Sequence, residues 1–302
     1  MKTLAGIKKI KLNSFKNIIK MKLIRFGKEK NEKPGILNEQ NERLDLSDFF
    51  DDWNSDFFAS DGLEKLQQLL SSEQKFSAVS SNERWAPCVA RPYKIICIGL
   101  NYSDHAAESG MKIPEEPIIF MKATNTIVGP YDNVYIPKTS TKTDWEVELA
   151  VIVGKEASYL NSIQESKNYI AGYCISHDVS ERAFQLERGG QWTKGKSCKS
   201  FNPVGPFMAT ADEVPSVNNL VMELKVNDFI MQRGNTDKMI FNVDYIIWYL
   251  SQFMVLEPGD VISTGTPPGV GMGKNPPVYL KHGDVVELKI EGLGTQRQTF
   301  IN

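Results

Sequence analysis

The sequence predicts an α+β fold in which strands predominate, built on a β-roll or sandwich. From Tyr93 onward, short apolar runs alternate with turn residues, and segments with helical spacing are few. Strands and helices do not alternate regularly, which argues against a Rossmann fold or a TIM barrel. For a chain of 302 residues we expect an extension over 1–20, a small N-terminal domain over 21–90 and a catalytic domain over 91–302.

The N-terminal elements are predicted in the following order. Residues 1–20 carry six lysines and no acidic residue, which fits either an upstream extension or an organelle transit peptide. A strand over 21–27 is followed by a hairpin return over 34–37. Helical spacing covers 46–70, with a break at Asp61-Gly62, and the prolines of 85–92 predict an extended linker.

The catalytic part is predicted to contain mostly strands. We expect strands over 94–99, 117–122, 133–137, 145–153, 170–176, 222–226, 229–233, 261–264, 278–280 and 285–290. We expect helical segments over 101–109, 163–169, 180–188 and 243–253, with Ser180 as the N-cap of the third. A glycine- and lysine-rich loop is expected over 189–199.

The composition is that of an ordinary globular protein. Hydrophobic residues make up 41% and charged residues 24%, and the net charge is -2, so there is no electrostatic case for a nucleic-acid or membrane partner. No apolar run approaches the roughly 18 residues of a membrane helix. Four cysteines lie far apart without CxxC spacing. We therefore expect reduced thiols and a cytoplasmic location, not a disulfide framework or a zinc site.

The segment 144–153 is the most informative stretch of the chain. It predicts a strand buried on both faces, with Glu146 and Glu148 on the same face. Two ionised carboxylates about 7 Å apart by strand rise repel each other and resist desolvation, and a divalent cation removes both penalties. A third acid, Asp178, ends another short apolar run. We therefore expect Glu146, Glu148 and Asp178 to share one metal ion.

Two points about this acidic set stay open at the level of sequence. The same pattern would arise if Glu146 and Glu148 lay on the solvated face of an edge strand and Asp178 capped a helix. If a metal is bound, ligation by oxygen alone favours Mg²⁺ first, and then Mn²⁺ or Ca²⁺, over zinc.

A candidate acid–base pair follows the strand predicted over 94–99. His105 and Glu108 are three residues apart, so they lie on one side of a single helical turn. A carboxylate beside an imidazole orients it and raises its basicity, which suits a general base that acts on water. An ordinary surface pair is the alternative. We expect His177 and His282 to be structural.

Two glycine-containing segments are further candidates. In the loop 189–199 a lysine turned inward would stabilise an enolate or a carboxylate, although a solvated loop has the same composition. The turn 263–271 lacks the P-loop pattern. It fits either a backbone nest for a substrate carboxylate or a tight structural turn.

Taken together, these residues resemble the fumarylacetoacetate hydrolase family over about 93–301. The markers in order are Gly99-Leu100-Asn101-Tyr102 with His105 and Glu108, Glu146-x-Glu148, Asp178-Val179-Ser180-x-Arg182, Gly195-Lys196-Ser197 and Thr264-Gly265-Thr266-Pro267. The resemblance implies a mixed β-sandwich roll, Mg²⁺ or Mn²⁺, a homodimer and a small-molecule 2-oxo acid as substrate.

The resemblance also implies a role for each matching residue. Glu146, Glu148 and Asp178 would be the metal ligands, and Lys196 would be the anion-stabilising lysine. His105 and Glu108 would be a water-activating dyad on a lid. Lys122 and Thr266 would contact the substrate.

The implied reaction is hydrolysis of a C–C bond in a 2,4-diketo acid, to give pyruvate and a carboxylic acid. Segment 180–192 resembles the bacterial branch that acts on 2,4-diketo-3-deoxy sugar acids, often labelled ureidoglycolate lyase. Acylpyruvates are the other candidate substrates. The alternatives are decarboxylation of a diacid such as oxaloacetate, a lyase or isomerase reaction at the same site, and a non-catalytic metal-binding dimer.

Overall fold

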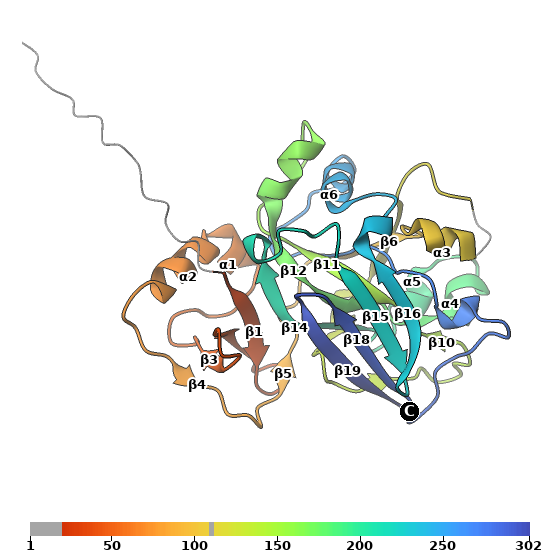
Figure 1. The fold of residues 1–302 in the computed structure, drawn as a ribbon, viewed down its shortest axis with the longest axis horizontal. Helices are drawn as coiled ribbons and strands as arrows, with labels where there is room; N and C mark the ends of the chain where they lie inside the picture. The colour runs from red at the N-terminus through yellow and green to blue at the C-terminus, as the bar shows by residue number, and fades with distance from the viewer. Residues whose placement is uncertain (1–19, 109–111) are drawn as a thin grey trace, which may run out of the picture.

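The structure, a computed structural model, describes residues 20–108 and 112–302, with only the backbone of residues 105–107. Strands predominate and helices are few, which confirms the predicted fold class (Figure 1). The expected extension falls almost entirely on residues 1–19, outside the described residues.

The larger sheet has twelve strands and forms the framework of the molecule. Ten of them follow one another in the order β4 (Ser77–Ala78), β3 (Arg43–Asp45), β2 (Lys33–Leu37), β1 (Lys22–Phe26), β14 (Asn202–Thr210), β12 (Ile170–His177), β11 (Val147–Val153), β17 (Val261–Ser263), β6 (Ile95–Gly99) and β7 (Ile118–Lys122). Two short strands lie off this path: β5 (Trp85–Ala86) pairs with β1, and β8 (Ile127–Val128) pairs with β14.

A second sheet of five strands packs against the first (Figure 1). Its order is β16 (Phe229–Asn235), β15 (Val221–Val226), β18 (Val285–Ile290), β19 (Gly294–Ile301) and β9 (Val134–Tyr135). A separate ribbon pairs β10 (Thr143–Asp144) with β13 (Ser180–Glu181).

The α-helices are short and lie outside the sheets. They are α1 (Ser55–Ala59), α2 (Gly62–Leu70), α3 (Ser103–Glu108), α4 (Arg182–Leu186), α5 (Thr193–Lys196) and α6 (Val243–Ser251). Single 3₁₀ turns occur at Thr124–Thr126, Ala211–Glu213, Thr236–Lys238 and Gly271–Gly273, and a longer one at Ile163–Tyr169.

Strand β11 is buried on both faces, as predicted. Val147, Leu149 and Val151 belong to the core between the two sheets, together with residues of β15 and β18. Ala150 and Ile152 point the other way, into a second core that helices α1 and α2 supply with aromatic and leucine side chains. The strand therefore has no solvated face that could carry its carboxylates in water.

The N-terminal segment is joined to the rest of the fold by strand pairing. Strand β1 runs antiparallel to β14, with Lys22 opposite Ala209 and Leu23 opposite Met208. The segment 85–92, expected as a linker, contributes β5, which pairs with β1. The domain boundary at residue 90 stays a prediction.

Several local expectations were wrong. No strand forms over 278–280, where Val278 and Leu280 instead donate backbone hydrogen bonds to Gly271 and Thr143. Ser180 lies in β13 and does not cap a helix, because Glu181 caps α4 by accepting the N–H of Ala183. The presumed loop 189–199 contains helix α5.

The longest strands not predicted from the sequence are β14 and β19. Strand β14 lies between β1 and β12, yet it contains Pro203, Gly205 and Pro206, residues that disfavour a central strand. The ladder with β12 shifts register beside Gly205, and this irregularity accommodates the prolines. Strand β19 is dominated by polar residues and gave no apolar pattern.

Within residues 20–108 and 112–302, no helix combines the length and the apolar character needed to span a membrane.

Candidate active site and metal centre

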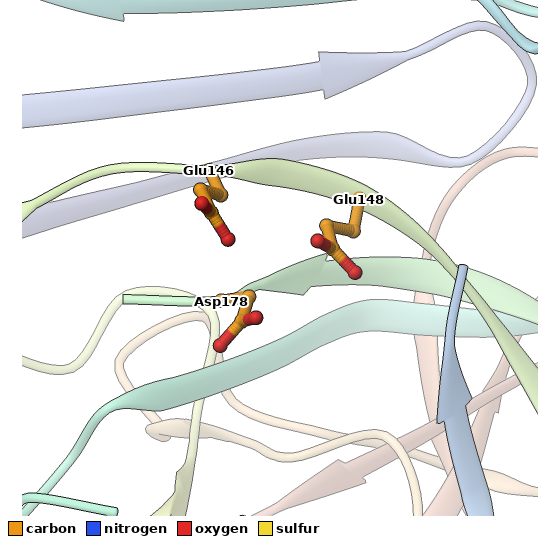
Figure 2. A group of neighbouring side chains, drawn as sticks. All are labelled: Glu146, Glu148 and Asp178. Carbon is orange, nitrogen blue, oxygen red and sulfur yellow. The ribbon is translucent and has the colours of Figure 1, made fainter. Parts of the chain in front are cut away.

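Three buried carboxylates meet where strands β11 and β12 end (Figure 2). Glu146 immediately precedes β11, Glu148 lies within it, and Asp178 immediately follows β12. The antiparallel ladder places Val147 opposite His177, so Asp178 comes beside Glu146 and donates its N–H to the Glu146 carbonyl at 3.0 Å. One oxygen from each carboxylate lies within 4.8 Å of the other two.

Two lysines approach the carboxylates from the protein side. Lys196 Nζ donates to Glu146 Oε2 and to Asp178 Oδ2, each at 2.7 Å. Lys122 Nζ donates to Asp178 Oδ1 and, at 3.1 Å, to the Val179 carbonyl. Burial works against a charged lysine, but Asp178 and Glu146 nevertheless hold the pKa of Lys196 above its ordinary value. Lys196 therefore keeps its positive charge.

Arg182 fixes the outermost carboxylate. Its Nη2 donates to Glu146 Oε1 at 2.6 Å, and its Nε donates to Asp144 Oδ2 at 2.8 Å. Although burial opposes ionisation, Lys196 and Arg182 lower the pKa of Glu146 well below its usual range. Glu146 is therefore ionised and held by two cations.

Glu148 is in the opposite situation. In the described part of the chain it accepts one hydrogen bond, from the Gly265 N–H at 3.0 Å, and no lysine or arginine pairs with it. Burial, and then the charges of Asp178 and Glu146, raise the pKa of Glu148 well above its ordinary value. A carboxylate in this position needs either a proton or an additional cation.

The residues present fit a divalent cation. All three candidate ligands are carboxylate oxygens, the donors that hard ions such as Mg²⁺ prefer. Figure 2 shows their side chains reaching into the same space between the strand ends. An ion there would also neutralise Glu148. The arrangement therefore favours the metal interpretation over a solvated edge strand or a helix cap.

The sequence predicts no role for Asp144, although this residue begins the segment 144–153 that contains Glu146 and Glu148. Its carboxylate accepts the N–H groups of Gly271 at 2.6 Å and Met272 at 3.0 Å, in addition to Arg182 Nε. It thus joins Arg182 to the turn at 271–273. An aspartate at the start of an apolar strand was the available sequence signal for this role. It was not sufficient, because the residues that Asp144 contacts are distant in sequence.

A cavity of about 140 Å³ opens onto the carboxylates. Glu146, Glu148, Lys196 and Thr266 are among its lining residues. The Thr266 hydroxyl accepts from Gln232 Nε2 at 2.8 Å and donates to the Val147 carbonyl at 2.9 Å. Lys122 lies behind Asp178 and does not line this cavity. Substrate contacts by Thr266 and Lys122 stay predictions.

Helix α3 brings Glu108, one member of the expected acid–base pair, to the same region. The Glu108 carboxylate accepts the Gly269 N–H at 3.1 and 3.0 Å. Gly269 belongs to the turn whose other end, Gly265, reaches Glu148. The side chain of His105 lies outside the described residues, so the dyad stays a prediction.

The other two described histidines have local partners. His177 is buried, its Nδ1 lies 3.0 Å from Gln298 Oε1, and burial lowers its pKa to about 3. His282 accepts the Asn302 N–H at 3.2 Å.

The fold and the site define a class of protein: a mainly β enzyme whose central strands carry a buried carboxylate cluster beneath a small cavity. Residues 94–301 match the fumarylacetoacetate (FAA) hydrolase C-terminal family. The chain belongs to this family, and the three carboxylates are the ligands with which it could bind a divalent metal.

Relatives of known name cover almost the whole chain. A Burkholderia multivorans protein, named provisionally as a hydrolase, is 50% identical over 279 residues, which is 92% of this chain and 98% of the relative. The structure of a probable 2-hydroxyhepta-2,4-diene-1,7-dioate isomerase from Mycobacterium abscessus is similar at 27% identity and a TM-score of 0.79, over 94% of this chain and 98% of that one.

The structure of maleylpyruvate hydrolase from Sphingobium sp. SYK-6 is similar at 26% identity and a TM-score of 0.75. The match covers 93% of this chain and 99% of the other. The protein is therefore an enzyme of a family whose named relatives include hydrolases and isomerases.

Proposed function

We propose that the protein hydrolyses the C3–C4 bond of a 2,4-diketo acid of the acylpyruvate type, with Mg²⁺ as its metal. Water adds across the broken bond: RCO–CH₂–CO–COO⁻ and H₂O give RCOOH and CH₃–CO–COO⁻. The observation that supports this proposal most is the group of three buried carboxylates, Glu146, Glu148 and Asp178, which lies beside Lys196 at a cavity. The likeness to a maleylpyruvate hydrolase and to a relative named provisionally as a hydrolase supports hydrolysis.

Glu146, Glu148 and Asp178 would hold the metal. When bound, it supplies a Lewis acid that polarises the oxygens of a 2-oxo acid and stabilises negative charge. Arg182 keeps the Glu146 carboxylate in place, and Lys122 does the same for Asp178. These contacts fix the ligands before the substrate arrives, which is the preorganisation that catalysis requires.

Lys196 would stabilise the leaving fragment. When the C3–C4 bond breaks, the electron pair stays on C3 and negative charge spreads to the C2 oxygen. The Lys196 ammonium is buried and keeps its proton, so it can hold that charge in a site from which most water is excluded. Removing one such donor typically costs about 10²–10³ in rate.

His105, oriented by Glu108, would supply the proton transfers. His105 takes a proton from water, the resulting hydroxide attacks C4, and the same proton can return to C3. Glu108 is tied to the glycine turn through Gly269, which places the helix at the edge of the site. General base catalysis of this kind contributes about 10²–10⁴ in rate.

The test is product formation by the full-length chain. The protein is stripped with EDTA and assayed on a panel of acylpyruvates with and without Mg²⁺. Pyruvate is followed by coupling to lactate dehydrogenase, and the second carboxylic acid is identified by mass spectrometry. We expect both products in equal amounts, and only with metal. No pyruvate from any acylpyruvate would refute the proposal.

A matched pair of histidine variants tests the dyad. We expect His105→Ala to bind metal as the wild type does and to lose at least about 100-fold in turnover. His282→Ala is the control, because that histidine contacts the C-terminal residue and not the site. An unchanged rate in His105→Ala would remove the dyad from the mechanism.

Isomerisation is the second candidate, favoured by the likeness to a structure described as a probable isomerase. An isomerase would convert a dienoate substrate into a product of the same mass, with no second acid. Decarboxylation of oxaloacetate would instead release CO₂. Mass spectrometry of the reaction mixture separates these outcomes from hydrolysis.

A further inference from the structure

One wall of the cavity is aromatic and begins at the active-site lysine. Lys196 Nζ lies 5.0 Å from the centroid of the Phe120 ring. The Phe120 and Trp192 rings meet edge to face, with centroids 5.3 Å apart. Behind Trp192, a Cβ on Gly99 would come within 2.7 Å of the indole Cζ3, so the indole lies directly on the backbone of β6. This wall is closed and presents only ring surface.

Two large apolar side chains line the cavity where it reaches the surface. Leu186, at the end of α4, is 45% exposed, and Met272 is 37% exposed. Met272 is not on a loose loop, because Asp144 accepts its N–H and that of Gly271. Exposed apolar side chains gathered around a cavity are typical of a surface that a ligand covers.

Polar groups in the cavity, apart from the carboxylates and Lys196, are nearly all engaged. The Arg182 guanidinium donates to Asp144, Glu146 and Gln185. The Thr266 hydroxyl has both an accepted and a donated hydrogen bond. Among the described residues, the side-chain nitrogens of Gln185 and Trp192 are the polar side-chain groups of this lining that have no hydrogen-bond partner.

This lining disfavours a hydroxylated tail. A hydroxyl that is buried without a partner costs about a factor of ten or more in binding. In the described lining a tail with three hydroxyls would find the Gln185 amide and the Trp192 indole N–H, so at least one hydroxyl would lack a partner. The volume, about 140 Å³, is below the roughly 300–1,000 Å³ of a typical small-molecule site, which suits a short tail.

From these observations we infer that the enzyme selects acylpyruvates with a short, apolar acyl group over polyhydroxylated diketo-deoxy sugar acids. The inference rests on the proposed function and narrows it. The aromatic wall and the pair Leu186 and Met272 set the selectivity, and the carboxylates and Lys196 hold the part that all these substrates share. It runs against the resemblance of segment 180–192 to sugar-acid enzymes.

Two substrates matched in carbon number provide the test. They are 2,4-dioxoheptanoate and its 5,6,7-trihydroxy derivative, assayed with the full-length chain and Mg²⁺ through pyruvate release. We expect kcat/KM to be at least about tenfold higher for the apolar substrate. Equal values, or a preference for the triol, would overturn the inference and leave the proposed hydrolysis standing. If neither substrate releases pyruvate, the proposed function itself has failed.

Variants of residues that line the cavity show which side chains set the substrate selectivity. Leu186→Gln and Met272→Gln each add an amide at the mouth, and we expect each to remove most of the roughly tenfold preference, because the remaining hydroxyl gains a partner. Ile230→Gln is the control: Ile230 is apolar and 51% exposed on β16, outside the cavity lining. An unchanged preference in both lining variants, or a reduced one in the control, would overturn the inference.

Discussion

Two clusters of acidic and basic side chains in the described part of the chain are built differently. In the N-terminal cluster each arginine donates hydrogen bonds from two nitrogens to one aspartate. Arg25 donates to Asp52 at 2.6 and 2.8 Å, and Arg84 donates to Asp132 in the same bidentate way. In the catalytic cluster Glu146 and Asp178 also accept hydrogen bonds from a charged side chain, that of Lys196. Glu148, beside them, accepts a single hydrogen bond, from the backbone N–H of Gly265.

The difference separates a structural cluster from a functional one. In the N-terminal cluster the ion pairs are complete, and they tie β1 to the segments 52–53 and 84–89. In the catalytic cluster one carboxylate lacks a cation, and the site opens onto a cavity. Such a carboxyl group is stabilised either by a proton or by a cation, and here a metal ion would supply the cation.

The largest effect is expected where the unpaired carboxylate is neutralised. Glu148→Gln keeps the shape of the side chain and removes its charge. We expect metal affinity and pyruvate release to fall by at least about a thousandfold, because a metal ligand and its charge are lost. Titration calorimetry with Mg²⁺ and Mn²⁺, together with the coupled assay, measures both. Full metal binding in this variant would show that Glu148 is not a ligand.

In the N-terminal cluster, the loss of a charged partner is expected to lower the stability of the fold and not the catalytic rate. Arg25→Met leaves Asp52 without its cation and frees the carbonyl groups of Pro87 and Val89. We expect the free energy of unfolding to fall by about 2–3 kcal/mol, less than the roughly 3–5 kcal/mol for a broken fully buried pair, because Asp52 is partly exposed.

Urea unfolding measures the stability of Arg25→Met, and the coupled assay should give an unchanged kcat. Lys33→Met is the control, since that lysine is largely exposed and lies 4.0 Å from Asp45. Loss of kcat in Arg25→Met without loss of stability would contradict the structural role of this cluster.

A smaller effect is expected at Asp144, which positions other groups without touching the substrate. Asp144→Asn retains the volume but weakens the hold on Arg182 and on the turn at Gly271 and Met272. We expect kcat/KM to fall about tenfold, as is common when an outer partner of a metal ligand is changed. A purely structural role would instead lower the melting temperature and leave the kinetic constants unchanged.

Sequence predicted the parts of the site that depend on local pattern. The alternation of β11 placed Glu148 and Val147 on opposite faces, and the structure confirms this. The roles of Asp144 and Arg182 could not be predicted from local pattern. Asp144 accepts the N–H groups of Gly271 and Met272, more than a hundred residues away, and Arg182 pairs with Asp144 and Glu146, more than thirty residues away. Strand β14 escaped notice because its prolines and glycine contradict the local signal for a central strand.

The smallest effect is expected from Glu32→Gln, the same chemical change as Glu148→Gln in the other cluster. Glu32 lies 3.7 Å from Arg25 and 3.5 Å from Arg84, but both arginines keep their aspartates when it is neutralised. We expect the free energy of unfolding to fall by less than about 1 kcal/mol and pyruvate release to stay unchanged. Urea unfolding and the coupled assay measure the two quantities. A loss above about 2 kcal/mol would mean that the N-terminal cluster needs all three acids, and incomplete pairing would then no longer distinguish the catalytic cluster.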